Sequence, residues 1–233
     1  MKHLILSILA LGAMISGGPV KAESPVVVEL FTSQGCSSCP PADRLMHELA
    51  KDADVIGLAL HVDYWDYIGW KDEYADPSHA VRQQGYAETG GRSMIYTPQM
   101  IVNGKESVVG ARGMELMKYI NWHKSAPALA QVDAIRNNSN IKVTLTGSGS
   151  AGSDLTVQLV QFTPLRKAKI TRGELAGHKL DYANVVESWD QIGTWNGRGT
   201  VTLTAELEQD LPAVVLVQRT GHGPIIAATR VRE

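Results

Sequence analysis

The first half of the chain alternates apolar runs with amphipathic segments. Residues 26–31 (VVVELF) and 55–60 (VIGLAL) are almost wholly apolar, which predicts two buried strands. Between these runs, apolar residues recur at helical spacing and predict a helix that ends near Lys51. Asp76 followed by Pro77 supplies the N-cap and first-turn residues that begin a second helix.

A hairpin and a third helix follow in the same half. Asn103-Gly104 stands between two apolar runs, and this dipeptide in that position is a strong hairpin signal. From Met114 to Ile120, apolar residues again recur at helical spacing. We therefore expect an α/β unit over residues 23–124.

The second half contains only short strand-like runs separated by Gly, Asn, Asp and Pro. About seven short strands at this spacing are typical of a β-sandwich. The runs cover residues 141–146, 155–162, 167–172, 179–187, 200–206, 213–218 and 225–231. Residues 125–140 carry a proline and an Asn/Ser cluster, which predict a linker. We expect an all-β sandwich domain over residues 141–233.

The N-terminal residues 1–22 have the pattern of a secretory signal peptide. Lys2 and His3 precede an apolar run over residues 4–15, and a small-residue cleavage site ends at Ala22. The apolar run is too short to span a bilayer, which needs about 20 residues. We expect cleavage near Ala22 and a periplasmic or secreted protein, the alternative being an uncleaved N-terminal anchor.

The charge of the chain is close to balanced, with 22 basic and 24 acidic residues. Removal of residues 1–22 takes away two lysines and leaves 20 basic against 24 acidic residues. A mildly acidic chain gives no reason to expect nucleic acid or an anionic membrane as partner. No later apolar run is long enough for a membrane span, we expect no cofactor, and the sequence does not predict the oligomeric state.

The two cysteines of the chain, Cys36 and Cys39, stand three apart with two serines between them. They can form a local disulfide, an intermolecular bond, or two ligands of a metal site. A C-x-x-C after an apolar strand and at the head of a helix is the usual place for a reversible dithiol. A passive disulfide is the alternative, but one that closes so small a loop contributes little stability.

The order of elements around the cysteines resembles the thioredoxin fold over about residues 25–123. Thr97-Pro98 precedes the predicted hairpin, where thioredoxin-like proteins carry a cis-proline that faces the dithiol, and Gly110 follows it, where the fold usually has a glycine. The resemblance predicts a thioredoxin-like α/β domain, followed by the all-β sandwich.

Three segments narrow the resemblance further. Residues 31–43 (FTSQGCSSCPPAD), 169–174 (KITRGE) and 182–186 (YANVV) are similar to a family of secreted bacterial thioredoxin-like proteins, catalogued as a domain of unknown function (1223). This similarity spans the whole mature chain. It supports the fold and implies no established activity.

The position of the motif assigns a role to each cysteine. A sulfur at a helix N-terminus faces unpaired N–H groups and the positive end of the helix dipole, which favour the thiolate, so we assign Cys36 as the nucleophile. Cys39 lies about one turn inward and would resolve a mixed disulfide. Thr97 and Pro98 would present backbone to a substrate strand, unless Pro98 is an ordinary turn proline.

The chain departs from thioredoxins in its acidic residues. Thioredoxins carry a buried acid six residues before the first cysteine, and that position here is Leu30. Glu29, one residue earlier, is expected to point to the opposite face of the strand, because side chains alternate. We interpret Glu29 as a strand-face charge rather than a proton shuttle.

An aromatic segment follows the second predicted strand over residues 61–70. Tyr64, Trp65 and Trp70 are its candidate substrate-binding residues, because the carboxyl ends of strands in α/β folds carry binding sites. The equal alternative is that these side chains cover a domain junction or cap the core.

Three functions fit these features. The leading hypothesis is an enzyme, a thiol–disulfide oxidoreductase that acts on protein thiols or disulfides with a redox partner. A copper-binding or metallochaperone module is the second, with His61 joining Cys36 and Cys39, since soft thiolates suit Cu(I); Asp63 and His79 lie nearby in sequence. The third is a non-catalytic interaction protein.

Overall fold

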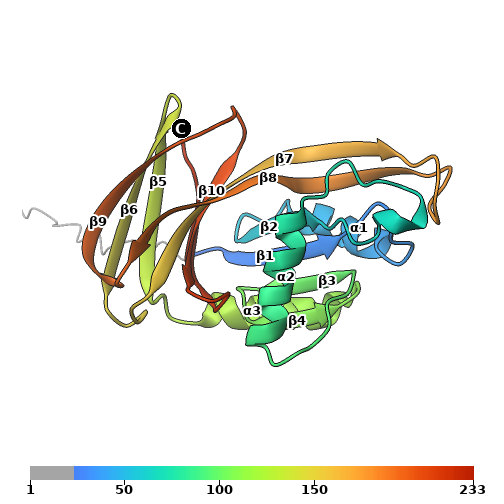
Figure 1. Ribbon diagram of the computed structural model, residues 1–233. Helices are drawn as coiled ribbons and strands as arrows, with labels where there is room; N and C mark the ends of the chain where they lie inside the picture. The colour runs from blue at the N-terminus through green and yellow to red at the C-terminus, as the bar shows by residue number, and fades with distance from the viewer. Residues whose placement is uncertain (1–23) are drawn as a thin grey trace, which may run out of the picture.

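A mixed eight-stranded sheet runs through the structure, a computed structural model that describes residues 24–233 (Figure 1). Its strand order is β11-β10-β7-β8-β2-β1-β3-β4, and a separate three-stranded sheet has the order β5-β6-β9. The elements are β1 (Val26–Thr32), α1 (Pro40–Leu49), β2 (Val55–His61), the 3-10 helix η1 (Asp66–Ile68), α2 (Pro77–Thr89), β3 (Gln99–Val102), β4 (Glu106–Val109), α3 (Gly113–Ser125), β5 (Ala130–Asn137), β6 (Asn140–Ser148), β7 (Leu155–Lys169), β8 (Lys179–Trp195), β9 (Arg198–Glu206), β10 (Ala213–Arg219) and β11 (Ile225–Arg230).

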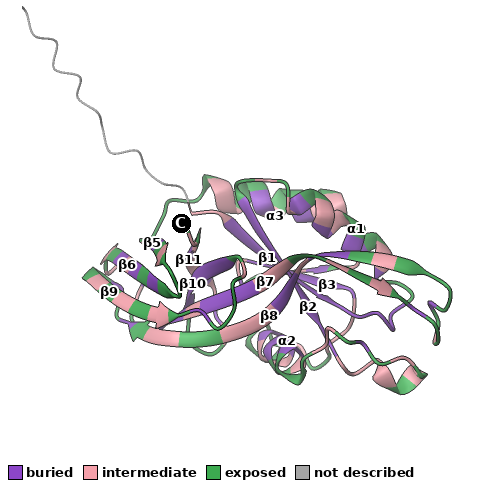
Figure 2. Cartoon of the chain, turned by 90° about the horizontal axis from the view of Figure 1, so that it is seen from above, coloured by how far each residue is buried: buried purple, intermediate pink, exposed green. Residues whose placement is uncertain are grey.

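The centre of the large sheet is the parallel pair β1 and β2, whose register runs from Val26↔Val55 to Thr32↔His61. Both strands are buried along their whole length, as their apolar runs predict. Figure 2 shows α1 and α3 on one side of these strands and α2 on the other. Because both faces are covered, near-continuous apolar sequence is the expected composition of such strands.

Local sequence signals account for the ends of these elements. The side chain of Asp76 caps α2 by accepting a hydrogen bond from Ser78 N at 2.8 Å, with Pro77 in the first turn. Asn103 and Gly104 turn the chain between β3 and β4, both with positive φ. The predicted helix starts and the hairpin are confirmed.

The β-rich half is arranged differently from the expected separate sandwich. Four of its strands extend the first sheet, because β8 pairs in parallel with β2 through Ala59↔Val185, and β7, β10 and β11 follow outward. An unpaired β2 edge would leave backbone donors and acceptors without partners, and β8 supplies partners where it meets β2 around Ala59. The expected strand over residues 167–172 is not separate, since β7 continues to Lys169.

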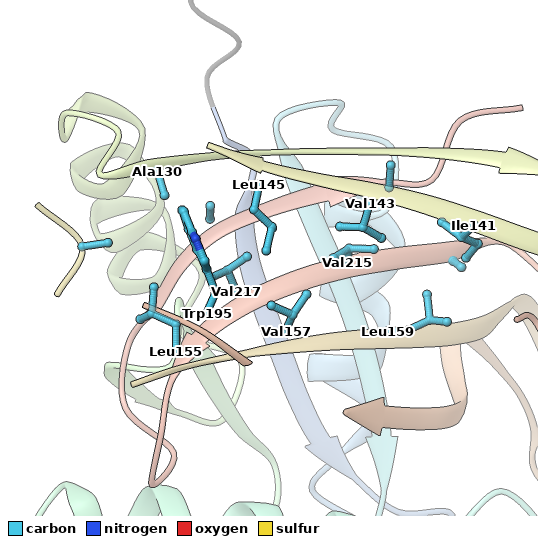
Figure 3. Close-up of a cluster of buried hydrophobic side chains, with 14 of the residues drawn as sticks. Ala130, Ile141, Val143, Leu145, Leu155, Val157, Leu159, Trp195, Val215 and Val217 are labelled. Carbon is cyan, nitrogen blue, oxygen red and sulfur yellow. The ribbon is translucent and has the colours of Figure 1, made fainter. Parts of the chain in front are cut away.

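A sandwich-like second layer exists only at one end of the sheet. Side chains of β6 such as Val143 and Leu145 face Val157 of β7 and Val215 of β10 (Figure 3), and together they form one buried apolar cluster. The segment expected to be a linker, residues 125–140, contains β5. Its two buried residues are Ala130 and Ala134, and their short side chains give little hydrophobic signal in the sequence.

The predicted signal peptide, residues 1–22, lies outside the described residues. Within residues 24–233, no helix is long and apolar enough to cross a membrane.

Candidate redox site

Cys36 and Cys39 form a disulfide at the N-terminus of α1, with a Cα–Cα distance of 5.4 Å. Cys39 is the N-cap residue, and its carbonyl accepts hydrogen bonds from the first helical N–H groups, Ala42 N at 2.8 Å and Asp43 N at 3.1 Å. Of the three pairings that the sequence allows, this is the local one. The Ser38 hydroxyl lies 3.4 Å from Cys36 Sγ.

The disulfide is almost completely covered. Cys36 is 1% exposed and Cys39 0% exposed, whereas Ser37 and Ser38 between them are exposed. A reacting partner therefore has to displace part of the structure to reach either sulfur.

The peptide bond between Thr97 and Pro98 is cis, as the resemblance to thioredoxin-like proteins implied. Gln99, the next residue, pairs with Phe31 near the end of β1, from which the chain continues to the cysteines. Gly110 N donates a hydrogen bond to Pro98 O at 2.9 Å. Register thus places the proline at the same end of the sheet as the disulfide.

The aromatic segment lies over the loop that leads to Cys36. A Cβ atom on Gly35 would come within 3.1 Å of Trp65 Cβ and 3.2 Å of Ile68 Cδ1. Trp65 Nε1 donates to Thr97 Oγ1 at 2.7 Å, and Trp70 Nε1 donates to Gln34 Oε1 at 2.8 Å. Two of the three predicted substrate-binding residues, Trp65 and Trp70, therefore contact the cysteine loop or the cis-proline.

The third predicted substrate-binding residue, Tyr64, forms its hydrogen bond with helix α2. Its hydroxyl donates to Gln83 Oε1 of α2 at 3.0 Å, and burial raises its pKa to about 12. Tyr67 is 80% exposed and stacks on Trp65 with ring centroids 6.2 Å apart.

The turn between β7 and β8 packs against the aromatic segment that lies over the cysteine loop. Gly173 has a φ of +74°, and a Cβ atom there would lie 3.3 Å from Trp70 Cβ. The turn thus lies directly against the aromatic segment, and a side chain in place of the glycine would crowd this contact. The segment 169–174, far away in sequence, belongs to the surroundings of the cysteines.

A buried polar cluster lies beside the disulfide on the α1 side of the sheet. Thr32 and His61 are register partners at the carboxyl ends of β1 and β2, so their side chains share a face. Thr32 Oγ1 donates to Asp43 Oδ1 at 2.7 Å. His61 Nδ1 and Asp72 Oδ2 are 2.7 Å apart, and both side chains are fully buried.

The two buried acids of this cluster have opposite pKa shifts. Burial raises the pKa of Asp43 to about 6, an effect opposed by the hydrogen bond from Thr32. Burial alone would also raise the pKa of Asp72, but His61 and the backbone N–H groups of Gln34 and Tyr74 together hold it below its usual value. Asp72 is therefore the ionised partner of His61, whereas Asp43 changes its charge near neutral pH.

The family model described as "Protein of unknown function (DUF1223)" matches residues 27–218. The chain belongs to the DUF1223 family. The crystal structure of the protein AGR_C_4864 from Agrobacterium tumefaciens is 30% identical with a TM-score of 0.76, over 89% of this chain and 93% of that one. HBP35 of Porphyromonas gingivalis, at 18% identity and a TM-score of 0.56, covers 89% of this chain and 74% of its own. The comparison with curated proteins finds no match.

This DUF1223 protein thus carries a C-x-x-C disulfide in a thioredoxin-like fold. The similarity to HBP35, at its low identity, supports the fold alone. The resemblance based on the cysteine segment is confirmed by the family match.

The metal-binding alternative requires that His61 or another side chain join the two cysteines as a ligand. His61 Nδ1 is engaged with Asp72, and His79 Nδ1 lies 2.8 Å from His61 O. Across residues 24–233, no three side chains of His, Cys, Asp or Glu are grouped so that they could hold a metal ion.

Glu29 lies on the α2 face of the sheet, opposite the face on which Leu30 packs with residues of α1. It is fully buried, and Arg82 Nε donates to Glu29 Oε2 at 2.6 Å while the Tyr86 hydroxyl donates to Oε1 at 2.6 Å. Glu29 is therefore a paired structural charge inside the protein.

Sequence reasoning missed Asp43 and Asp72 as parts of the site. The spacing of Asp43, four residues after Cys39, was a usable signal, because such residues share a helix face. Asp72 gave no signal, since it lies in an irregular segment whose path depends on the whole fold.

Proposed function

We propose that this DUF1223 protein is an exported thiol–disulfide oxidoreductase that exchanges its Cys36–Cys39 pair with protein thiols and disulfides. The observation that carries the proposal is the closed disulfide at the N-terminus of α1, at the same end of the sheet as the cis Thr97-Pro98 bond. Export is part of the proposal, because residues 1–22 have the sequence pattern of a secretory signal peptide.

The reduced form begins the reaction. The positive end of the α1 dipole favours a thiolate at Cys36, and the Ser38 hydroxyl is close enough to donate a hydrogen bond to it. The Cys36 thiolate attacks a substrate disulfide, forms a mixed disulfide and releases one substrate thiolate. Cys39 then attacks Cys36 Sγ, closes the internal disulfide and releases the second substrate thiolate. The substrate gains two electrons, the cysteine pair loses two, and a second thiol–disulfide protein restores the dithiol.

Because the disulfide is buried, a substrate has to open the structure around it before it can react. A substrate chain that pairs with the backbone at Thr97-Pro98 has to displace the Trp65 indole, which donates a hydrogen bond to the Thr97 hydroxyl. An extended segment of a partly unfolded protein offers both the backbone groups and the apolar side chains to replace that contact. We therefore propose protein substrates rather than small thiols.

Activity assays with cysteine variants test this function. The purified mature protein is assayed for insulin reduction with dithiothreitol and for oxidation of reduced ribonuclease. We expect activity in at least one direction, complete loss in Cys36→Ser, and no loss in Ser150→Ala, a change in an exposed turn. Inactivity in both assays, with two titratable thiols after reduction, would contradict the proposal.

Partners can be trapped through the resolving cysteine. In Cys39→Ala the mixed disulfide at Cys36 cannot be resolved, so substrates and the redox partner should remain attached. The double variant Cys36→Ala/Cys39→Ala is the control. Trapped proteins that appear equally in the control would show that Cys36 is not the attacking group.

A further inference from the structure

Closure of the internal disulfide requires that Cys39 lose its proton. The thiol of a free cysteine has a pKa of about 8.5, and the attacking species is the thiolate. Cys39 is 0% exposed, so bulk water does not reach its sulfur in this arrangement of the chain. A base inside the protein can take this proton where bulk water does not reach.

Asp43 is placed to be that base. It lies one helical turn after Cys39, its backbone N–H donates to Cys39 O at 3.1 Å, and both side chains are buried on the inner side of α1. Residues four apart on a helix have Cβ atoms about 5–6 Å apart, within reach of a thiol proton directly or through one water. Among residues 24–233, the other buried carboxylates are Glu29, which faces away from α1 in its pair with Arg82, and Asp72, which is paired with His61.

Near Asp43, two buried polar atoms of the described residues lack the hydrogen-bond partners that a site serving only stability would provide. His61 Nε2 and the Tyr182 hydroxyl are buried and find no hydrogen-bond partner within residues 24–233, although their rings are in edge contact at 4.6 Å. Burial raises the pKa of Tyr182, and the charges of Asp43 and Asp72 raise it further. Buried unsatisfied groups of this kind are rare and call for an explanation.

The charged and titratable groups that face this cluster come from five parts of the chain. They are Asp43 and His47 on α1, His61 on β2, Asp72 and Tyr74 on the segment after η1, His79 on α2 and Tyr182 on β8.

We propose that Asp43 accepts the proton of Cys39, with Thr32 fixing its carboxylate and the His61–Asp72 pair supplying the adjoining polar environment. The inference rests on the dithiol function proposed above and names the group that this function needs. The proton passes from Cys39 Sγ to the Asp43 carboxylate, the Cys39 thiolate displaces the substrate thiolate from Cys36 Sγ, and the released substrate thiolate takes up a proton from water.

A chromogenic disulfide separates the two steps. The reduced protein is mixed in a stopped-flow instrument with one equivalent of a nitrobenzoate disulfide, which releases one yellow thiolate when Cys36 attacks and a second when Cys39 resolves the adduct. In Cys39→Ala only the first release is expected, which assigns the two phases. If the reduced wild-type protein neither releases chromophore nor reduces insulin, although both thiols titrate after unfolding, the dithiol function itself fails.

Asp43→Asn tests the base. We expect the first phase to change by less than about threefold and the second to slow by about 100-fold at neutral pH, the usual contribution of a positioned base. Asp181→Asn, at an exposed aspartate of β8, should change neither phase. A second phase within about threefold of wild type in Asp43→Asn would overturn the inference while leaving the dithiol function intact.

The pH profile distinguishes proton transfer from a structural effect. The second phase of the wild type should rise with pH as Asp43 ionises and then level off. Thr32→Val removes the hydrogen bond that lowers the pKa of Asp43, so the midpoint of this profile should move to higher pH. An unmoved midpoint in Thr32→Val, with the folded state retained, would overturn the assignment of the titrating group to Asp43.

Discussion

Replacing Asp43 with asparagine is expected to stabilise the oxidised protein at neutral pH. The carboxyl has a pKa of about 6 in the folded protein against an ordinary value of 3.8, because it is buried. Since the folded state has the higher pKa, it binds the proton more tightly than the unfolded chain does. The stability that this group contributes is therefore complete below pH 3.8 and is lost as the pH rises to about 6.

The size of the effect follows from the two pKa values. They differ by about 2, and each unit corresponds to about 1.4 kcal/mol, so ionising Asp43 costs the folded state about 3 kcal/mol above pH 6. Asparagine has nearly the same shape, and its amide oxygen can still accept the hydrogen bond from Thr32. The variant avoids the cost, and its advantage should shrink to about 1 kcal/mol near pH 4.5, where the folded wild-type carboxyl is mostly protonated.

Urea denaturation followed by far-UV circular dichroism measures this difference between about pH 4.5 and about pH 8. The matched change at an exposed aspartate, Asp181→Asn, should alter the free energy of unfolding by less than about 0.5 kcal/mol at every pH. A destabilised Asp43→Asn at neutral pH, or a gain that does not depend on pH, would refute the reasoning that a buried carboxylate is held here at an energetic cost.

Three further changes test other parts of the structure. Glu29→Gln leaves the buried Arg82 guanidinium without its counter-charge and should lower the free energy of unfolding, measured in urea, by about 3–5 kcal/mol. The control Glu48→Gln, at an exposed glutamate, should change it by less than about 0.5 kcal/mol. Similar losses in both variants would contradict a special role for the buried pair. Trp65→Phe removes the hydrogen bond to Thr97 and should speed reduction of the disulfide by dithiothreitol severalfold; an unchanged rate would mean that this contact does not limit access. Gly35→Ala brings a methyl group to 3.1 Å from Trp65 Cβ and should cost about 1–3 kcal/mol, and an unaltered Tm would show that the aromatic segment is free to move away.

The local architecture around the cysteines could be predicted because its signals are local. The β-branched run of β1, the prolines after Cys39 and the Asp76 cap each act within a few residues. The cis-proline could be predicted from the resemblance, which fixed its place in the chain before β3. These features specified the α/β part and the dithiol.

The β-rich half could not be placed by the same reasoning. Several strands of similar composition could have paired with the free edge of β2, and the periodicity of a strand does not name its neighbour. The structure selects β8, and the long β7–β8 hairpin then reaches the aromatic segment through Gly173. The expected two-layer sandwich thus survives only at one end, where it shares its larger sheet with the thioredoxin-like part.

The sequence alone determined that this protein has one cysteine pair at the start of a helix, because strand, turn and helix signals act between near neighbours in the chain. Only the tertiary structure decided which acids surround that pair. Burial beneath α1 gives Asp43 its raised pKa, and the path of an irregular segment brings Asp72 to His61. Both effects depend on desolvation by residues distant in sequence, and desolvation is a property of the assembled fold.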